Sequence, residues 1–188
     1  MVGKREAINM KTLYLISGDL AAGKSTLAHA LADELKVPCF IKDDMKEIVC
    51  DIVGFNNREE NRKNSKAAVA LMIYSFGQLA KQGQDAILEA NFRDDELSQI
   101  FDIVNNNGYE VKKIMLYGDP KVLYQRFLER LPFRHEAHTT QHLEESYEKY
   151  EKVLLDFREF CGDDFIKIDT TNLVLEETLK LVLDAIKK

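Results

Sequence analysis

Eight consecutive residues, Gly18-Asp-Leu-Ala-Ala-Gly23-Lys24-Ser25, fit the pattern G-x-x-x-x-G-K-[ST]. Glycines at both ends of such a loop let backbone N–H groups turn inward, where they can bind phosphate oxygens. We expect Lys24 to be exposed and to bring a mobile positive charge to the terminal phosphates during catalysis. The Ser25 hydroxyl is a hard oxygen ligand for Mg²⁺, whose shell phosphate oxygens and water would complete. The pattern therefore predicts a nucleotide site with Mg²⁺.

The surroundings of this loop support the prediction. An apolar run typical of a strand, Leu13 to Ser17, precedes it, and a helical pattern over Thr26 to Glu34 follows. The positive N-terminal end of that helix would point at the phosphates. A Gly-rich turn that merely leads into a capped helix is the alternative. The agreement of strand, loop and helix favours nucleotide binding.

Two carboxylates follow the second apolar run of the chain, Cys39 to Lys42, in the segment Lys42-Asp43-Asp44-Met45-Lys46. Ligands of open α/β sheets bind beyond the carboxyl ends of the strands, so these side chains are candidates for the site. Asp43 could orient and deprotonate an acceptor hydroxyl, while Lys46 holds a charged part of the substrate. The alternative is structural, because Asp44 could cap a helix over residues 45–53.

Two further polar clusters lie at the ends of the third and fifth apolar runs, which are Ala86 to Ala90 and Phe165 to Ile168. In Glu89-Ala90-Asn91-Phe92-Arg93, Glu89 could hold a metal-bound water near the phosphates, or it could simply pair with Arg93. In Asp169-Thr170-Thr171-Asn172, the short polar groups could cap the C-terminal helix or line a nucleotide base site. Both interpretations of the last cluster stay open.

Arginines recur every four residues at Arg126, Arg130 and Arg134. On a continued helix they would share one face and could converge on a polyphosphate. Pairing with exposed acids such as Glu129 and Glu136 is the alternative, since surface ion pairs are common and weak.

A lid is expected around these arginines. Pro120 after Asp119 favours a helix start, and Pro132 should end that helix, which leaves residues 133–139 as a mobile flap over the nucleotide. The flap region also holds His135, His138 and His142. They lack a matching set of acidic or cysteine ligands, so a metal site there is disfavoured.

The elements that must position these residues form a regular pattern. Five short apolar runs each precede a helical pattern, which predicts βα units and a largely parallel sheet. A long amphipathic helix is expected over residues 141–160. No repeat or linker divides the chain, so we expect one domain, 1–188, with a lid at about 126–140. The five runs are Leu13 to Ser17, Cys39 to Lys42, Ala86 to Ala90, Lys113 to Tyr117 and Phe165 to Ile168.

Composition excludes several classes of protein. The chain has 188 residues, of which 45% are hydrophobic and 31% charged, as in an ordinary globular domain. Its longest apolar stretch, residues 69–76, is far shorter than the roughly 20 residues of a membrane span. A formal charge of −6 opposes binding to extended nucleic acid. Because no secretion signal is evident, we expect a cytoplasmic protein.

Together these motifs resemble the P-loop kinases, in particular the group of the 5′-polynucleotide kinase domain, the chloramphenicol phosphotransferases and the zeta-toxin kinases. The resemblance covers nearly the whole chain and implies an α/β, three-layer, P-loop NTP hydrolase-like fold with a five-stranded parallel sheet in the order 2-3-1-4-5. It implies that Asp43 is the general base and that Arg130 touches the transferring phosphoryl group. It also implies that Arg126 lies against adenine and phosphates, with Thr170 and Thr171 at the edge of the base.

These inferences combine into one expected function. The chain is expected to be an ATP- and Mg²⁺-dependent kinase that transfers the γ-phosphate to a hydroxyl of a small or nucleotide-like acceptor. A nucleic-acid 5′-end kinase and a nucleotide-dependent switch or ATPase remain alternatives, and the oligomeric state stays open. The expected acceptor-binding residues are Asp43, Lys46, Asn91, Arg93 and Arg134, and the metal-site residues are Ser25 and Glu89. The expected nucleotide-binding residues are Gly18, Asp19, Leu20, Ala21, Ala22, Gly23, Lys24, Ser25, Thr26, Arg126, Thr170 and Thr171.

Overall fold

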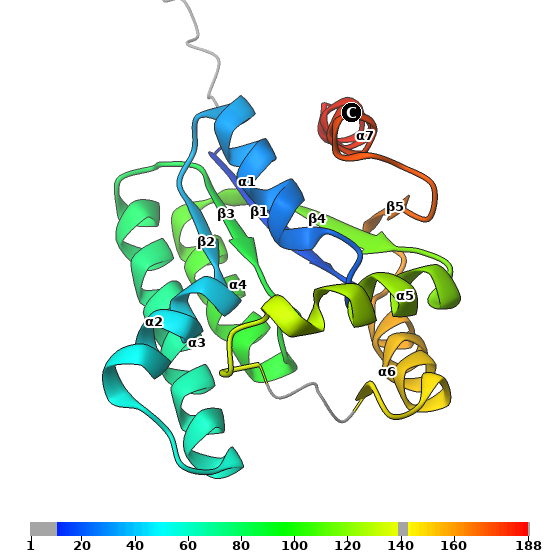
Figure 1. Cartoon of the computed structure of the whole chain (residues 1–188). Helices are drawn as coiled ribbons and strands as arrows, with labels where there is room; N and C mark the ends of the chain where they lie inside the picture. The colour runs from blue at the N-terminus through cyan, green and yellow to red at the C-terminus, as the bar shows by residue number, and fades with distance from the viewer. Residues whose placement is uncertain (1–10, 139–142, 188) are drawn as a thin grey trace, which may run out of the picture.

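A five-stranded parallel sheet forms the centre of the molecule, in the order β2-β3-β1-β4-β5 (Figure 1). The structure is a computed structural model that describes residues 11–138 and 143–187. The strand order confirms the predicted α/β fold and its order 2-3-1-4-5. The strands are β1 (Lys11–Gly18), β2 (Cys39–Ile41), β3 (Ala86–Glu89), β4 (Tyr109–Tyr117) and β5 (Ile166–Asp169).

Helices connect the strands and cover both faces of the sheet. Helices α3 and α4 pack beside each other in one layer, and α1 and α7 pack beside each other in the other layer. The helices are α1 (Lys24–Leu35), α2 (Lys42–Val53), α3 (Arg58–Lys81), α4 (Asp94–Asn107), α5 (Pro120–Arg130), α6 (Tyr147–Phe160) and α7 (Leu175–Ile186), and a short 3-10 turn, η1 (Leu131–Phe133), follows α5.

Alternation along β1 divides the core into two layers. Leu13 and Leu15 pack with α3 and α4 on one face, whereas Ile16 packs with α1 and α7 on the other. All three side chains are at most 2% exposed. The central position of β1 buries both faces of this strand, so the loop that follows it starts from a rigid support.

The ends of the predicted elements needed several corrections. α2 begins at Lys42 with Ile41 as its N-cap, so Asp44 lies in the first turn and is not the cap. β2 therefore ends at Ile41, one residue earlier than expected. The expected helix over 141–160 begins only at Tyr147, because the Ser146 hydroxyl accepts a hydrogen bond from the Lys149 amide and caps it there. Its positions 141 and 142 lie outside the described residues.

The start and end of α5 agree with the prediction. Asp119 is the N-cap, and its carboxylate accepts hydrogen bonds from the amides of Lys121 (2.9 Å) and Val122 (3.1 Å). Pro120 occupies the first turn, and the α-helix ends at Arg130, just before Pro132 in η1. Arg134 thus follows a 3-10 turn and does not continue the helical face of the two preceding arginines. Among the helices of the described residues, none is long and apolar enough to span a membrane.

Candidate active site

The loop between β1 and α1 has a backbone that only certain residues tolerate. Gly18 has φ +143°, and a Cβ there would lie 2.0 Å from the carbonyl oxygen of Leu116. Gly23 has φ +88° and forms the N-cap of α1 without any side-chain cap. Ala21 adopts φ 65°, a left-handed conformation that typically costs a non-glycine residue about 1–3 kcal/mol. A helix N-terminus without a side-chain cap leaves N–H groups that an anion can bind.

Lys24 is partly buried within this loop, whereas the sequence suggested an exposed side chain. Its ammonium donates to the carbonyl oxygens of Gly18 (3.0 Å) and Asp19 (2.8 Å). Burial lowers the pKa of Lys24, against the raising effect of Glu89 and Asp43. The charge therefore lies at the mouth of the loop, next to two carboxylates.

Asn91, expected to bind the acceptor, follows β3 and hydrogen-bonds the phosphate loop. Its side-chain oxygen accepts from the Gly18 amide (3.0 Å), and its side-chain nitrogen donates to the Gly18 carbonyl (2.9 Å). Asn91 also lines a 260 Å³ cavity beside the loop. It is thus placed both to hold the loop and to face a ligand.

Ser25 and Glu89, the two residues expected at the metal site, contact each other directly. The Ser25 hydroxyl donates to a carboxylate oxygen of Glu89 at 3.0 Å, and both residues line a 580 Å³ cavity. Glu89 is only 4% exposed, and this burial raises the pKa of its carboxyl group, with Lys24 opposing. Two hard oxygen ligands beside a phosphate loop fit Mg²⁺, which takes its other ligands from phosphate and water.

Asp43 lies in the first turn of α2, close to two cationic side chains and a histidine. Its carboxylate oxygens are 2.9 Å from Lys42, 3.4 Å from Arg134 and 3.6 Å from His138. Burial pushes the pKa of Asp43 upward, but these neighbours outweigh it and hold the pKa well below its usual range. Asp43 is therefore an anion at neutral pH.

The two expected halves of the site share one cavity. The 580 Å³ cavity is bounded by the phosphate loop on one side and by α2 and the lid on the other. The 260 Å³ cavity adjoins it, because both are lined by Leu20, Lys24, Asp43, Glu89, Arg134 and His138. A ligand on the phosphate loop and a second ligand beside Asp43 would thus be neighbours.

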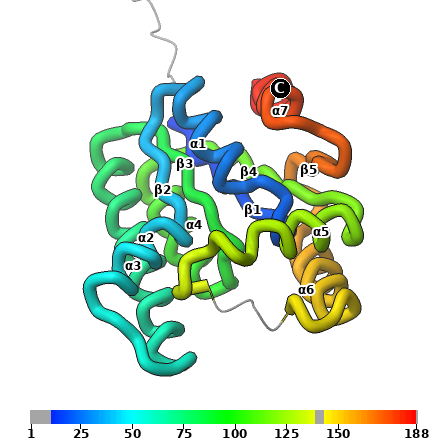
Figure 2. Tube along the Cα trace, viewed as in Figure 1, coloured from blue at the N-terminus to red at the C-terminus, as the bar shows by residue number. Residues whose placement is uncertain are grey.

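The segment after η1 crosses to the helices α2 and α3 (Figure 2). The Ala137 carbonyl accepts hydrogen bonds from Lys46 of α2 (2.6 Å) and Asn61 of α3 (3.0 Å). Lys46 is 7% exposed and also lines the 260 Å³ cavity. The described part of the lid, up to residue 138, therefore closes one side of the cavity in this structure.

Two histidines of the same segment bind carboxylates of α2. His138 lies 2.6 Å from Glu47, and His135 lies 2.9 Å from Asp51. Burial lowers the pKa of His138, although Asp43 and Glu47 both oppose this change. Within residues 11–138 and 143–187, no group of three or more His, Cys, Asp and Glu residues could hold a metal ion.

Arg130 at the end of α5 lines the 580 Å³ cavity together with Lys24. Its Nε is buried and has no hydrogen-bond partner among the described residues. A buried guanidinium nitrogen without an acceptor is costly, so an acceptor from a bound ligand would stabilise it. A phosphate oxygen is an acceptor of the right charge.

Arg126 reaches the loop after β5. Its guanidinium donates to the carbonyl oxygens of Thr170 (3.1 Å) and Thr171 (2.9 Å). Arg126 and Thr170 line a 200 Å³ cavity together with Ala21, Ala22, Gly23 and Thr26. The structure thus brings the residues expected at the base next to the phosphate loop.

Some expected site residues lie elsewhere. Arg93 pairs with Glu96 at the start of its own helix, at 2.9 Å, and is absent from the described lining of the three cavities above. The cluster after β5 does not cap α7, whose N-cap is Val174. Position 139 of the expected flap, position 140 of the expected lid and His142 lie outside the described residues.

Sequence reasoning missed the contribution of α6 to the site. Arg158 pairs with Asp19, and the Tyr150 hydroxyl donates to the Leu20 carbonyl at 2.7 Å. The amphipathic pattern did predict that this helix buries one stripe. Nothing in the sequence connects Arg158 with a partner 139 residues away.

Comparison with known proteins agrees with this geometry. The family model described as Zeta toxin matches residues 3–159 of the chain. The chain belongs to the zeta toxin family. Comparison with curated proteins gave no match. Membership agrees with the resemblance seen in the phosphate loop and in the residues after β2.

Several solved structures share the fold of this zeta toxin family member. A presumed kinase from Chloroflexus aurantiacus is 24% identical, with 96% of this chain and 98% of that chain covered and a TM-score of 0.73. A sugar kinase from Janibacter sp. HTCC2649 is 16% identical (94% and 95% covered, TM-score 0.62). A shikimate kinase from Bacteroides thetaiotaomicron is 16% identical (94% and 99% covered, TM-score 0.59). At these identities the likeness concerns the fold, which is that of small P-loop kinases. The family and the fold together support nucleotide-dependent phosphotransferase chemistry.

Proposed function

We propose that this protein is an ATP-dependent kinase that transfers the γ-phosphate to a hydroxyl group of a small acceptor. The observation that carries the proposal is the shared cavity: Lys24 of the phosphate loop and Asp43 of α2 line the same 580 Å³ space. A kinase needs a phosphate cradle and a base beside one another, and this cavity offers both.

The phosphate end of the reaction falls to the loop and α5. Backbone N–H groups at the start of α1 would bind the phosphate chain, and Lys24 would exchange its two loop carbonyls for the β and γ phosphates. Arg130, with its unpaired Nε, would bind the transferring phosphoryl group. Mg²⁺, held by Ser25 and through water by Glu89, would neutralise phosphate charge when bound.

The acceptor end falls to Asp43, Lys46 and the lid. Asp43 would accept a hydrogen bond from the acceptor hydroxyl and take its proton as the phosphoryl group arrives. In this structure its oxygens contact Lys42 and Arg134, so an acceptor hydroxyl would share the carboxylate with these two cations. The phosphates of a bound nucleotide compete for Arg134, which would release the carboxylate as the site fills.

The size and charge of the acceptor cavity favour a small polar acceptor. Its 260 Å³ are lined by Lys42, Lys46 and Asn91, next to Asp43. A nucleic-acid 5′-end kinase would need an extended basic track, whereas the net charge of the chain is −6. A switch that only hydrolyses ATP would have no use for the polar space beside Asp43.

Release of phosphate and transfer of phosphate must be measured separately. Purified protein is incubated with ATP and Mg²⁺, with and without a panel of sugars, sugar acids, nucleosides and a 5′-hydroxyl oligonucleotide. We expect ADP formation to rise with one hydroxyl acceptor while free phosphate stays low. ADP and free phosphate that rise together without any acceptor would contradict the kinase and support the ATPase.

A further inference from the structure

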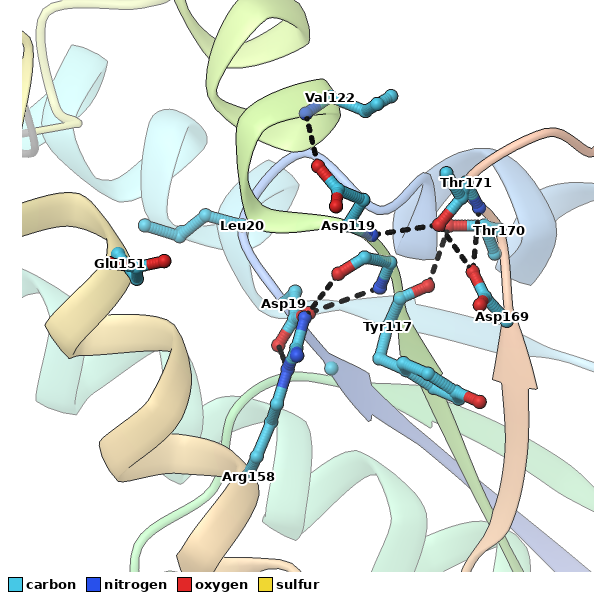
Figure 3. Close-up of polar contacts among 12 residues, drawn as sticks. Asp19, Leu20, Tyr117, Asp119, Val122, Glu151, Arg158, Asp169, Thr170 and Thr171 are labelled. Atoms are coloured by element: carbon cyan, nitrogen blue, oxygen red, sulfur yellow. Dashed lines mark hydrogen bonds and ion pairs between the residues drawn. The ribbon is translucent and has the colours of Figure 1, made fainter. Parts of the chain in front are cut away.

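A buried ion pair joins α6 to the phosphate loop (Figure 3). The side chain of Asp19 is 0% exposed, and its two oxygens lie 3.2 Å and 3.0 Å from Nε of Arg158. A terminal nitrogen of Arg158 also donates to Asp19, and the Gly118 amide lies 3.3 Å from the same carboxylate. Within residues 11–138 and 143–187, the hydrogen bonds to the Asp19 carboxylate come from the Arg158 side chain and the Gly118 amide.

The same guanidinium also contacts the end of β4. Arg158 donates to the Gly118 carbonyl, and its guanidinium carbon lies 5.6 Å from the ring centre of Tyr117. The Tyr117 carbonyl in turn accepts from the Thr170 amide at 2.8 Å, and the Asp119 amide donates to the Thr171 hydroxyl at 2.7 Å. Figure 3 shows these contacts as one continuous group at the carboxyl end of the sheet. Arg158 therefore lies between the phosphate loop and the end of β4, which in turn contacts the loop after β5.

The contacts of α6 fix the orientation of two successive loop residues. Arg158 holds the side chain of Asp19, whose carbonyl accepts from Lys24. Tyr150, about two turns earlier in α6, donates its hydroxyl to the carbonyl of Leu20. The next residue, Ala21, has the left-handed φ of 65°. A strained loop keeps its conformation only when its surroundings fix it, and α6 supplies that support.

We propose that Arg158 is a positioning residue for nucleotide binding, which acts through Asp19 to hold the phosphate loop in its binding conformation. The inference rests on the proposed nucleotide site, and it assigns Arg158 no contact with the ligand. Without Arg158, the buried Asp19 carboxylate would lose the cation that it hydrogen-bonds, and the loop would have to move to hydrate it. Only a fraction of the molecules would then present the binding conformation.

The test compares Arg158→Ala, Arg158→Lys, Asp19→Ala and the double variant Asp19→Ala/Arg158→Ala. Calorimetry gives the Kd of ATP with Mg²⁺ and of inorganic tripolyphosphate with Mg²⁺, and thermal melting gives stability. Lys152→Ala is the matched control, because it removes an exposed cation from the same helix. Tripolyphosphate reports on binding at the phosphate loop alone, since it has no nucleoside.

The expected pattern separates positioning from simple stabilisation. If the binding conformation falls to about a tenth of the population in Arg158→Ala, both Kd values rise about tenfold. Arg158→Lys should recover part of this loss, because it keeps the charge without the planar fork. The double variant should have a higher melting temperature than Arg158→Ala, since it leaves no buried Asp19 carboxylate without Arg158. Its Kd values should be as high as those of Arg158→Ala, because the loop still lacks this support.

Three results would overturn the inference. The first is a Kd of Arg158→Ala equal to that of wild type and Lys152→Ala, even with a lower melting temperature, which would make Arg158 a stabilising residue only. The second is a loss of ATP affinity without a loss of tripolyphosphate affinity, which would locate the effect at the base. The third is a double variant that binds like wild type. A wild-type protein that binds neither ligand would instead contradict the proposed function.

Discussion

The guanidinium of Arg134 lies 3.4 Å from a carboxylate oxygen of Asp43, across 91 residues of sequence. A lid residue thus contacts the carboxylate that we propose as the base, next to Lys42 and His138. An anion held by cations is a poor proton acceptor until some of them find other partners. The lid and the base are therefore coupled, and nucleotide phosphates offer the lid arginine that other partner.

Asp43→Asn should separate transfer from nucleotide binding. The amide keeps the size of the carboxylate but cannot take the proton, so we expect transfer to fall by about 10²- to 10⁴-fold. The Kd for ATP with Mg²⁺ should stay within a few fold of wild type. Turnover with the acceptor from the panel and calorimetry with ATP measure the two quantities.

Asp44→Asn is the matched comparison for that experiment. Asp44 is 54% exposed and lies 3.5 Å from His29, so we expect most of the transfer to remain. A large loss in Asp44→Asn with undiminished transfer in Asp43→Asn would assign the base to Asp44. Loss of ATP binding in Asp43→Asn would assign Asp43 to the metal or the fold.

Lys24→Ala should abolish transfer with a modest effect on folding. The side chain makes two hydrogen bonds to loop carbonyls, so the free energy of unfolding should fall by about 1–3 kcal/mol. The missing charge at the β and γ phosphates should remove measurable turnover. Turnover and urea unfolding are measured on the same preparation. Turnover at the wild-type level would contradict the assignment of the phosphate loop.

Arg130→Ala should weaken ATP binding or transfer without weakening the fold. Its buried Nε has no partner among the described residues, so removing the side chain should leave the melting temperature unchanged or higher. The loss in ATP binding or transfer should exceed the roughly 0–1 kcal/mol of an exposed ion pair. Lys121→Ala, an exposed cation on the same helix, is the control. Equal effects of both variants would make Arg130 a surface residue.

Arg126→Ala should lower both stability and affinity. Its guanidinium donates to the carbonyls of Thr170 and Thr171, which stay without these donors in the variant. We expect a lower melting temperature together with weaker ATP binding, whereas tripolyphosphate affinity should change less. Loss of tripolyphosphate affinity to the same extent would mean that Arg126 acts on the phosphates of the nucleotide and not on its adenine base.

Two groups, His138 and Asp43, should each lower the free energy of unfolding on acidification, in separate pH ranges. The pKa of His138 is lowered by burial, so protonation of the unfolded chain below about pH 6.5 opposes folding. The pKa of Asp43 is held low by its cations, so its contribution is present above about pH 4 and is lost as the pH falls towards the folded value. Urea unfolding from about pH 7 to pH 3 measures both decreases.

Two variants assign these decreases. His138→Gln should remove the decrease that begins near pH 6.5, and Asp43→Asn the decrease below about pH 4. Parallel curves for wild type and both variants would mean that neither group titrates differently in the folded and unfolded chains.

The order of the βα units, the phosphate loop and the polar residues at the ends of β2 and β3 can be read from the sequence alone. These features are local: apolar periodicity, the two glycines of the loop, and polar residues at strand ends act within a few residues of one another. Parallel strands then place their carboxyl ends at one edge of the sheet. For this reason Lys24, Ser25, Asp43 and Glu89 could be assigned to one site before their distances were known.

Contacts between segments far apart in the chain become apparent only in the three-dimensional structure. Arg158 with Asp19, and Arg134 with Asp43, join residues separated by 139 and 91 positions. The amphipathic pattern of α6 shows that the helix packs, but it does not show which loop meets its polar flank. Arg93 also follows a strand end, but it pairs with the nearby Glu96 and does not line the three cavities described above. The partner of a charged side chain is set by the three-dimensional packing, because burial and distance fix the strength of a charge interaction.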